Sequence, residues 1–457
     1  MMHLSEAAKA TGGTVLGEDA QFTCVTHDSR GDMRGQLFVA MRGERVDGHD
    51  YAAVALEAGA AAAMITHQVP GLRSALLVKD ARLALGALAA HWRGKFDLPL
   101  AAVTGSNGKT TVKEMLAGIL RAMTGSADTV LATEGNLNND IGLPLTLLKL
   151  RQQHRYAVVE MGMNHFGEIS YLTRIGRPSV ALVNNAGVAH LGGLGSVDGI
   201  ARAKGEIFEG LAANGTAVIN ADDAFAGLWQ GLAAGRKILT FGLDKPADVS
   251  ASYQLHADSS ALQLKTPLGE ANVELPVAGQ HNVRNALAAT AAAIAMSASL
   301  QAIVAGLESF SAVKGRLQRK RGINGALVID DTYNANPASV RAAIDVLTAH
   351  PGDKLLVLGD MGELGGDAAE MHAEIGAYAK KSGVQALYVL GDLTQEMVKT
   401  FGSGAHHFET PAALAQVLEK GMHAGCTVLV KGSRFMRMER VVELITENNP
   451  EGESDAA

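Results

Sequence analysis

Short runs of apolar and often β-branched residues recur along the chain, and segments with the apolar spacing of amphipathic helices follow them. This alternation of buried strands and helices is typical of a parallel α/β sheet. In the middle of the chain the predicted strands lie in LAAVTG (100–105), YAVVEMG (156–162), SVALVNNAG (179–187), TAVINAD (216–222) and KILTFGL (237–243). Nearer the C-terminus they lie in ALVIDD (326–331), KLLVLGD (354–360), ALYVLGD (386–392) and CTVLVKGS (426–433), with helices predicted over 337–350 and 369–383.

The pattern divides the chain into three blocks, which predict three domains of the α/β class. Their predicted boundaries are 1–83, 84–315 and 316–457. In the first block, extended segments at 36–41 and 74–80 flank an alanine-rich helix predicted over 51–65. A helix over 84–96 opens the second block, and a more β-like tail over 253–279 closes it. The third block repeats a doubly wound pattern, in which ligands bind beyond the carboxyl ends of the strands.

One uncharged segment, 285–307, has the length of a membrane span. It is rich in alanine and interrupted by polar residues, so it is weakly hydrophobic compared with spans rich in leucine, isoleucine and valine. Ser299 can cap a helix that begins at residue 300, so we expect two buried helices here instead. We expect the acidic, turn-rich tail over 447–457 to be disordered.

The composition narrows the classes of protein that the chain can represent. With 457 residues it is too long for a single hydrophobic core, and its formal net charge of −7 argues against a nucleic-acid scaffold. Cys24 and Cys426 match no metal-binding spacing and are expected to be small buried residues. The N-terminus lacks a basic region followed by an apolar core, so we expect no secretion signal and a cytoplasmic location.

The segment 100–116, LAAVTGSNGKTTVKEML, carries the clearest chemical signal. An apolar strand ends in a glycine-containing turn, and Lys109 and Thr110 then open a helix. The usual phosphate-loop template would place a glycine at position 103, where this chain has Val103, so the loop reads G-x-x-G-K-T. Its glycines permit close approach of an anion, and the free N–H groups of the helix point to the same place. A glycine turn that caps an ordinary helix is the alternative, but the position between strand and helix favours nucleotide binding.

Further polar residues follow the predicted strands. Glu160 and His190 each lie near the carboxyl end of a strand, where a site is expected, although a solvated carboxylate and a loop histidine would look the same. Lys204 lies in a helix with mixed charges and is by composition a surface lysine. The turns IDDTYNANP (329–337) and VKGSR (430–434) could serve a nucleotide and an anion, or could simply be an Asx-rich turn and a helix-capping turn.

Three motifs together resemble the Mur ligases, the ATP-dependent amide ligases of peptidoglycan precursor synthesis. They are TGSNGKTT (104–111), HNVRNALAA (281–289) and DDTYNANP (330–337), and the resemblance covers nearly the whole chain in the order of its blocks. It implies a small N-terminal α/β domain for a uridine nucleotide, a central P-loop ATPase domain with a parallel sheet and a C-terminal Rossmann-like domain. It also implies that ATP phosphorylates a peptide carboxylate, which an amine then attacks. The short phosphate loop is the normal form in that family.

The resemblance assigns roles position by position. It implies ATP contacts at Gly105, Ser106, Asn107, Gly108, Lys109, Thr110, Thr111, Asn285, Arg316, Asp331, Tyr333 and Asn334, and it places His281 and Asn282 in the same motif as Asn285. It implies Mg²⁺ ligands at Thr110, Glu160 and His190, and a Lys204 that CO₂ converts to a metal-facing carbamate; Lys109, Lys204 and His190 are then the catalytic residues. It implies substrate contacts at Ser29, Arg30, Asn138 and Asn139.

Further segments resemble one branch of the family, among them 35–52, 134–150 and 429–434. They imply UDP-N-acetylmuramoyl-tripeptide and D-alanyl-D-alanine as substrates of a monomer with no nucleic-acid or membrane partner. The diaminopimelate-adding member carries an Asp-Asn-Pro-Arg type motif in its last domain, whereas this chain has LGDMGELGGD (358–367). That member and folylpolyglutamate synthetase remain alternatives of the same chemistry. A P-loop ATPase that acts as a conformational switch is an alternative of a different class.

Overall fold

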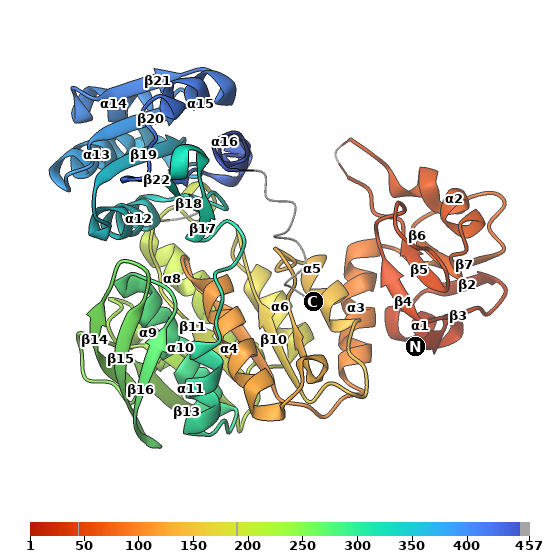
Figure 1. The fold of residues 1–457 in the computed structure, drawn as a ribbon. Coiled ribbons are helices and arrows are strands. Elements are labelled where there is room, and N and C mark those ends of the chain that lie inside the picture. Colours follow the sequence, from red (N-terminus) through yellow and green to blue (C-terminus); the bar gives the residue numbers. More distant parts are fainter. Residues whose placement is uncertain (44, 189–190, 448–457) are drawn as a thin grey trace.

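A six-stranded, fully parallel sheet forms the centre of the computed structural model, which describes residues 1–43, 45–188 and 191–447 (Figure 1). Its strand order is β13-β12-β11-β8-β10-β9, so the strand that precedes the phosphate loop lies inside the sheet. The strands are β8 (Leu100–Thr104), β9 (Val130–Ala132), β10 (Tyr156–Glu160), β11 (Val180–Val183), β12 (Thr216–Asn220) and β13 (Lys237–Phe241). The strand predictions for this block are confirmed, because continuous apolar runs mark strands that are buried on both faces.

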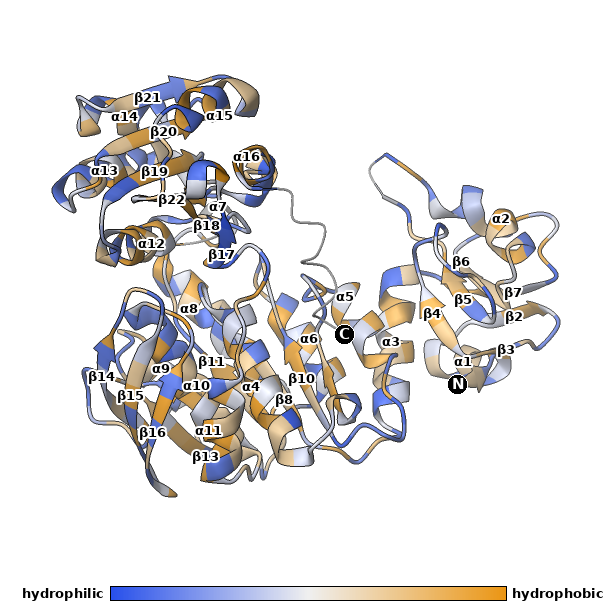
Figure 2. Ribbon diagram, viewed as in Figure 1, coloured by the Kyte–Doolittle hydropathy of each residue, from blue (hydrophilic) through white to orange (hydrophobic). Residues whose placement is uncertain are grey.

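Helices cover both faces of this central sheet. One face packs on α4 (Lys109–Thr124), α10 (Gln280–Ala295) and α11 (Leu300–Glu308), together with the antiparallel sheet of β14 (Ser250–Leu255), β15 (Ser260–Thr266) and β16 (Gly269–Leu275). The other face packs on α3 (Ala81–Arg93), α5 (Gly142–Leu147), α6 (Glu168–Gly176), α8 (Val197–Gly205) and α9 (Ala226–Leu232). The short helix α7 (Leu191–Leu194) precedes α8. Figure 2 shows the apolar strands enclosed between these layers.

The uncharged segment 285–307 forms two helices, as predicted. Helix α10 ends at Ala295, and the side chain of Ser299 accepts a hydrogen bond from the Ala302 N–H at 3.2 Å to begin α11. Of the helices within the described ranges, none has both the length and the apolar character that crossing a bilayer requires. The C-terminal residues 448–457 of the predicted disordered tail lie outside the described residues.

The N-terminal part forms a five-stranded sheet with the order β2-β7-β6-β5-β4. Its strands are β2 (Thr14–Gly17), β4 (Cys24–Thr26), β5 (Gln36–Val39), β6 (Ala62–Ile65) and β7 (Ser74–Leu77), and β1 (Met2–His3) pairs with β3 (Gln21–Phe22) beside α1 (Leu4–Thr11).

Two predictions for this part are wrong. The helix expected over 51–65 ends early, because α2 is confined to Ala52–Glu57 and Ala62–Ile65 is a buried strand between two parallel neighbours. Alanine favours a helix in isolation, and here tertiary pairing overrides that preference. Cys426 is buried as expected, but Cys24 is exposed because it lies on the edge strand β4.

The C-terminal part is a second six-stranded sheet with the order β17-β18-β22-β19-β20-β21. Only the edge strand β17 runs antiparallel to its neighbour. The strands are β17 (Gln318–Arg321), β18 (Leu327–Asp331), β19 (Asp353–Gly359), β20 (Ala386–Leu390), β21 (Ala405–Phe408) and β22 (Cys426–Lys431). The helices are α12 (Pro337–Ala349), α13 (Ala368–Lys381), α14 (Gln395–Phe401), α15 (Pro411–Glu419) and α16 (Glu439–Ile445). The α/β class with three domains is therefore confirmed.

Helix α3 joins the N-terminal sheet to the central one. It packs on α1 on one side and on α5 and α6 on the other. The predicted boundary after residue 83 falls inside this helix. Both this boundary and the one after residue 315 stay predictions. In Figure 1 the C-terminal sheet lies above the central domain, whereas the N-terminal sheet lies to its right.

Candidate active site

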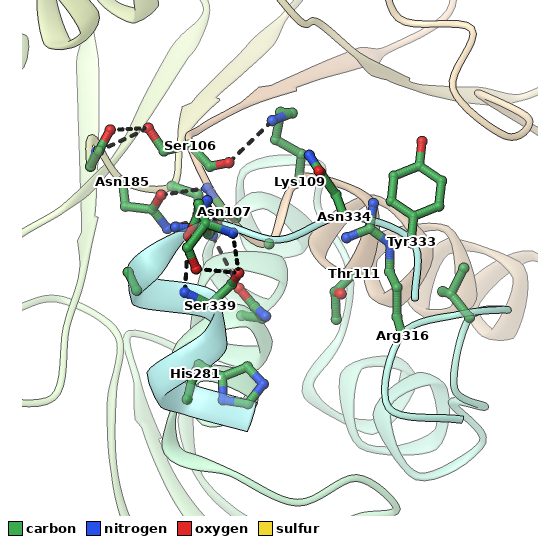
Figure 3. Close-up of a pocket in the computed structure, with 18 of the residues that line it drawn as sticks. Ser106, Asn107, Lys109, Thr111, Asn185, His281, Arg316, Tyr333, Asn334 and Ser339 are labelled. Carbon is green, nitrogen blue, oxygen red and sulfur yellow. Dashed lines mark hydrogen bonds between the residues drawn. The ribbon is translucent and has the colours of Figure 1, made fainter. Parts of the chain in front are cut away.

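A cavity of about 690 Å³ lies between the central and C-terminal sheets. On the central side it is lined by the phosphate loop and by residues that follow β10 and β11. On the C-terminal side it is lined by residues that follow β18 and β22 and by the start of α12. The cavity therefore lies at the carboxyl ends of parallel strands from two sheets, which is where α/β folds bind their ligands (Figure 3).

The phosphate loop joins β8 to α4 and is held by the loop after β11. Ser106 N–H donates to the Asn185 carbonyl at 2.9 Å, and Asn107 N–H donates to the Asn185 side-chain oxygen at 2.8 Å. Gly108 has a φ of 78°, a conformation that glycine adopts without strain, and α4 begins directly after it. The loop is thus fixed in place while the start of α4 faces the cavity, as an anion site requires.

Lys109 is the cation of this loop. Its Nζ donates to the Gly105 carbonyl at 2.7 Å, so the side chain folds over its own loop. Burial lowers the pKa of Lys109, and the carboxylate of Glu160 acts in the opposite direction. A phosphate in the cavity would supply a stronger partner for this ammonium than a carbonyl does.

Glu160, which lines the cavity, and Thr110, which is hydrogen-bonded to it, suit a magnesium ion. The Thr110 hydroxyl donates to Glu160 Oε2 at 2.7 Å, and Asn138 Nδ2 donates to Glu160 Oε1 at 2.7 Å. Glu160 is only 2% exposed. Within the described ranges there is no cluster of three His, Cys, Asp or Glu side chains that could hold a metal. A hydroxyl and one carboxylate nevertheless fit Mg²⁺, which keeps several waters and binds nucleotide phosphates.

Lys204 lies on α8 and is 2% exposed, so its expected position on the surface is wrong. The described part of the chain offers its amine no hydrogen bond or ion pair. Burial, with a smaller contribution from the charge of Lys109, holds the pKa of Lys204 well below its usual range. This lowering of the pKa favours the neutral, nucleophilic form of the amine. His190, the proposed neighbour from sequence, lies outside the described residues.

The C-terminal domain contributes an aromatic and charged wall. The Arg316 guanidinium lies 4.2 Å from the centre of the Tyr333 ring and donates to the Thr110 hydroxyl at 3.0 Å. Lys431 Nζ lies 2.6 Å from Asp331 Oδ2 and also donates to the Asn334 carbonyl at 2.8 Å. Burial raises the pKa of Asp331, against the opposing charge of Lys431. The two domains therefore meet at Thr110.

A network of amide side chains supports the loop from α10. Asn285 accepts from Asn184 Nδ2 at 3.0 Å and donates to Asn282 at 3.2 Å, and all three are at most 5% exposed. His281, one turn of helix earlier, lines the cavity, and burial lowers its pKa to about 4. The α10 motif is therefore linked to the phosphate loop through Asn285 and Asn184, and its histidine lines the cavity.

The structure brings most of the sequence-predicted residues together. The cavity lining includes Ser106, Asn107, Gly108, Lys109, Thr111, Asn138, Asn139, Glu160, His281, Asn282, Asn285, Arg316, Asp331, Tyr333 and Asn334, and Gly105 and Thr110 belong to the same loop. Ser29 and Arg30 lie instead in the N-terminal sheet domain, where Arg30 pairs with Asp28 at 2.7 Å.

Three asparagines of this site were given no individual role from the sequence, although Asn336 lies in the turn 329–337 that was a candidate for nucleotide binding. Asn184 and Asn185 hold the backbone of Asn107, and Asn336 contacts its side chain. The Asn-Asn pair at the end of a predicted strand was the available signal for the first two, because polar residues at that position face the site.

Comparison with known proteins identifies the family. The profile described as "Mur ligase middle domain" matches residues 103–293, "Mur ligase, glutamate ligase domain" matches 315–434, and "Mur ligase family, catalytic domain" matches 21–93. The chain is also 42% identical over 448 residues to the UDP-N-acetylmuramoyl-tripeptide–D-alanyl-D-alanine ligase of Escherichia coli K12. The aligned region covers 97% of this chain and 98% of the Escherichia coli ligase. The chain belongs to the Mur ligase family.

Solved structures of Mur ligases share the whole fold. A crystal structure of MurF from Acinetobacter baumannii superimposes with a TM-score of 0.90 at 38% identity and covers 96% of this chain and 97% of that one. MurF from Thermotoga maritima in complex with ADP gives a TM-score of 0.82 at 29% identity and covers 93% and 98% of the two chains. These Mur ligases therefore match the chain along nearly its entire length, all three domains included.

Proposed function

We propose that this Mur ligase joins D-alanyl-D-alanine to UDP-N-acetylmuramoyl-tripeptide with the hydrolysis of ATP to ADP and phosphate. The observation that carries the proposal is the 42% identity, over 97% of the chain, to the Escherichia coli ligase named for these substrates. The geometry supports it, because a cavity large enough for a nucleotide lies between a phosphate loop and a second domain rich in polar groups.

The chemistry needs an activated carboxylate, because a free carboxylate is a poor electrophile. The terminal carboxylate oxygen of the tripeptide attacks the γ-phosphorus of ATP and ADP leaves, which gives an acyl phosphate. The dipeptide amine then attacks the acyl carbon, the C–N bond forms, the C–O bond to phosphate breaks and a proton is lost. The protein has little covalent work in these steps, so catalysis rests on positioning and on neutralising charge.

Two cationic side chains are proposed to neutralise phosphate charge. Lys109 exchanges its carbonyl partner for the γ-phosphate, and Arg316 reaches the same place from the C-terminal domain. Thr110 and Glu160 would hold Mg²⁺, which would draw negative charge from the transferred phosphoryl group. Because Arg316 of the C-terminal domain donates to Thr110 of the central domain, this group of phosphate-binding residues is complete only when the two domains are in contact.

We further propose that Lys204 carries a carbamate. The neutral amine attacks the carbon of CO₂, a C–N bond forms and one proton is released to solvent, which leaves a carboxylate on the side chain. Support comes from the buried amine with its lowered pKa, for which the described chain offers no partner. A carboxylate is also compatible with a nearby divalent ion, whereas an ammonium would be repelled.

Several assignments stay predictions within this proposal. Ser29 and Arg30 are proposed to bind the uridine diphosphate in the N-terminal domain, and Asn138 and Asn139 to contact the peptide substrate. His190 is proposed as a magnesium ligand. The domain boundaries 1–83, 84–315 and 316–457, the cytoplasmic location and the monomeric state are proposed from the sequence and the resemblance.

The test is phosphate release from ATP in the presence of UDP-N-acetylmuramoyl-tripeptide and a panel of amines. We expect D-alanyl-D-alanine to stimulate release and to yield a product with the mass of the pentapeptide, while diaminopimelate and glutamate do not. Stimulation by a single amino acid, but not by the dipeptide, would refute the assignment. ATP turnover that is independent of every amine would instead favour a P-loop switch.

The carbamate has its own test, which reads the modification directly. Protein equilibrated with ¹³C-labelled bicarbonate should show a carbamate signal in its ¹³C NMR spectrum, and Lys204→Ala should lack both the signal and turnover. Bicarbonate should not rescue this variant, because no amine remains to react. Near-normal activity of Lys204→Ala would remove the carbamate from the mechanism.

A further inference from the structure

The C-terminal domain touches the phosphate loop through Asn336, the residue that caps helix α12. Asn336 Nδ2 donates to the side-chain oxygen of Asn107 at 2.7 Å, although 229 positions separate the two residues in sequence. Both side chains line the cavity, and both are partly buried. Figure 3 shows Asn107 beside Ser339, which belongs to the first turn of α12. The contact therefore exists only while the C-terminal domain lies against the phosphate loop.

The hydrogen bonds at Asn336 fix which way its amide points. The Ser339 backbone N–H donates to Asn336 Oδ1 at 2.9 Å, and a backbone N–H can only donate. The atom of Asn336 that faces Asn107 must then be Nδ2, which is itself only a donor. The atom of Asn107 that receives it must be the oxygen, so the orientation of the second amide follows from that of the first.

In this series of hydrogen bonds the N–H₂ group of Asn107 is not used, so it is available to donate to a ligand in the cavity. Among the described residues, nothing accepts a hydrogen bond from Asn107 Nδ2. The backbone of Asn107 is already fixed by Asn184 and Asn185, so only its side chain is free to rotate. Asn336 removes that freedom.

Capping alone does not explain an asparagine at position 336. Aspartate and serine cap helices about as well, because a cap needs only a side-chain oxygen for the N–H of the first turn. Asparagine adds a donor at a similar length, and that donor is the group that reaches Asn107.

We propose that Asn336 is a positioning residue for ATP: it holds the oxygen of Asn107 so that the N–H₂ group of Asn107 faces the nucleotide phosphates. The inference rests on the ATP-binding role proposed above. It adds that the C-terminal domain tunes the phosphate loop by orienting one amide within it. If the side-chain amide of Asn107 were rotated by 180°, its oxygen would face the phosphates and repel them.

Two substitutions separate this role from the cap. Asn336→Ser keeps a capping oxygen but is too short to reach Asn107, and Asn336→Asp keeps both the cap and the length but can only accept. In Asn336→Ser, loss of one oriented hydrogen bond should raise the KM for ATP about fivefold. In Asn336→Asp the rise should be larger, because the carboxylate draws the N–H₂ of Asn107 away from the phosphates. The kcat, the KM for D-alanyl-D-alanine and the Tm should stay close to those of the unsubstituted protein.

A double-mutant cycle with Asn107→Ala shows whether Asn336 acts through Asn107. We expect Asn336→Ser to leave the KM for ATP of the Asn107→Ala variant unchanged. Thr410→Asp is the matched control, because Thr410 also caps a helix of the C-terminal domain but does not line the cavity. It should leave the KM for ATP unaltered.

The outcomes that overturn the inference differ from those that overturn the proposed function. If the unsubstituted protein releases phosphate normally and Asn336→Ser has the same KM for ATP, only the role of Asn336 is refuted. An equal rise in KM in both Asn107 backgrounds also refutes it, because Asn336 would then act by another route. If the unsubstituted protein neither binds nor turns over ATP, the proposed function and this inference both fall.

Discussion

Gly108→Ala tests how closely the phosphate loop is packed against helix α10. Gly108 has a φ of 78°, and a left-handed conformation costs a residue with a side chain about 1–2 kcal/mol. A Cβ at this position would also lie 2.6 Å from Asn184 Nδ2 and closer still to Asn285 Oδ1. These two atoms form a buried hydrogen bond of 3.0 Å, which the new methyl group must separate.

The two costs can be separated within one helix. Breaking a buried hydrogen bond costs about 1–3 kcal/mol, so Gly108→Ala should lower the free energy of unfolding by about 2–5 kcal/mol in all. Gly125, at the other end of α4, has a φ of 72°, and a Cβ there would meet nothing within 4 Å. Gly125→Ala therefore carries the backbone strain alone and should cost only about 1–2 kcal/mol.

The assay is guanidinium unfolding of both variants, followed by tryptophan fluorescence. Trp229 is fully buried in the central domain and reports on its unfolding. Binding of ATP should also weaken in Gly108→Ala and not in Gly125→Ala, because only the first displaces the loop that faces the cavity. Equal losses of stability in the two variants would refute the argument, since the crowding by Asn184 and Asn285 would then have no energetic consequence.

Two further predictions follow from charges in the same cavity. Lys431→Met removes the ion-pair partner of the buried Asp331 and should lower the free energy of unfolding by about 3–5 kcal/mol. The double variant with Asp331→Asn should regain much of this stability. Denaturant unfolding of the single and double variants measures both effects, and a double variant no more stable than Lys431→Met would contradict the pairing. His281 has a pKa of about 4 when folded, whereas an unfolded histidine takes up a proton near pH 6.5. Stability should therefore fall as the pH drops from 6.5 to 4, and thermal unfolding across this range should show a smaller fall in His281→Asn.

The sequence predicted those elements whose signal is local. The strand that ends at Thr104 and the one that ends at Glu160 are apolar runs that pack on both faces, and the Ser299 cap follows from a single side chain. The failure over 62–65 has the opposite cause. Four residues that read as helix in isolation pair with β5 and β7, and no local pattern records those partners.

The candidate site divides in the same way. Lys109 and Thr110 belong to one loop, so their spacing along the chain already predicts their chemistry. The burial of Lys204 and the contact of Asn336 with Asn107 depend on how distant segments pack. The local sequence alone predicts an exposed lysine at position 204 and a turn around position 336. The role proposed for Lys204 comes from the resemblance to the family, whereas nothing in the sequence indicated that Asn336 contacts the phosphate loop.

The strand order of the C-terminal sheet also bears on how the protein is made. Among the described strands, β22 comes last along the chain, yet it lies between β18 and β19 in the interior of the sheet. Until the ribosome has passed residue 431, β18 and β19 have no common neighbour, and each presents an unpaired edge that favours association with other chains. The same strand delivers Lys431 to the cavity, so a nascent or truncated chain lacks both the closed sheet and the cation. The interior of the sheet and the cation of the cavity are therefore completed by the same step of synthesis, the addition of β22.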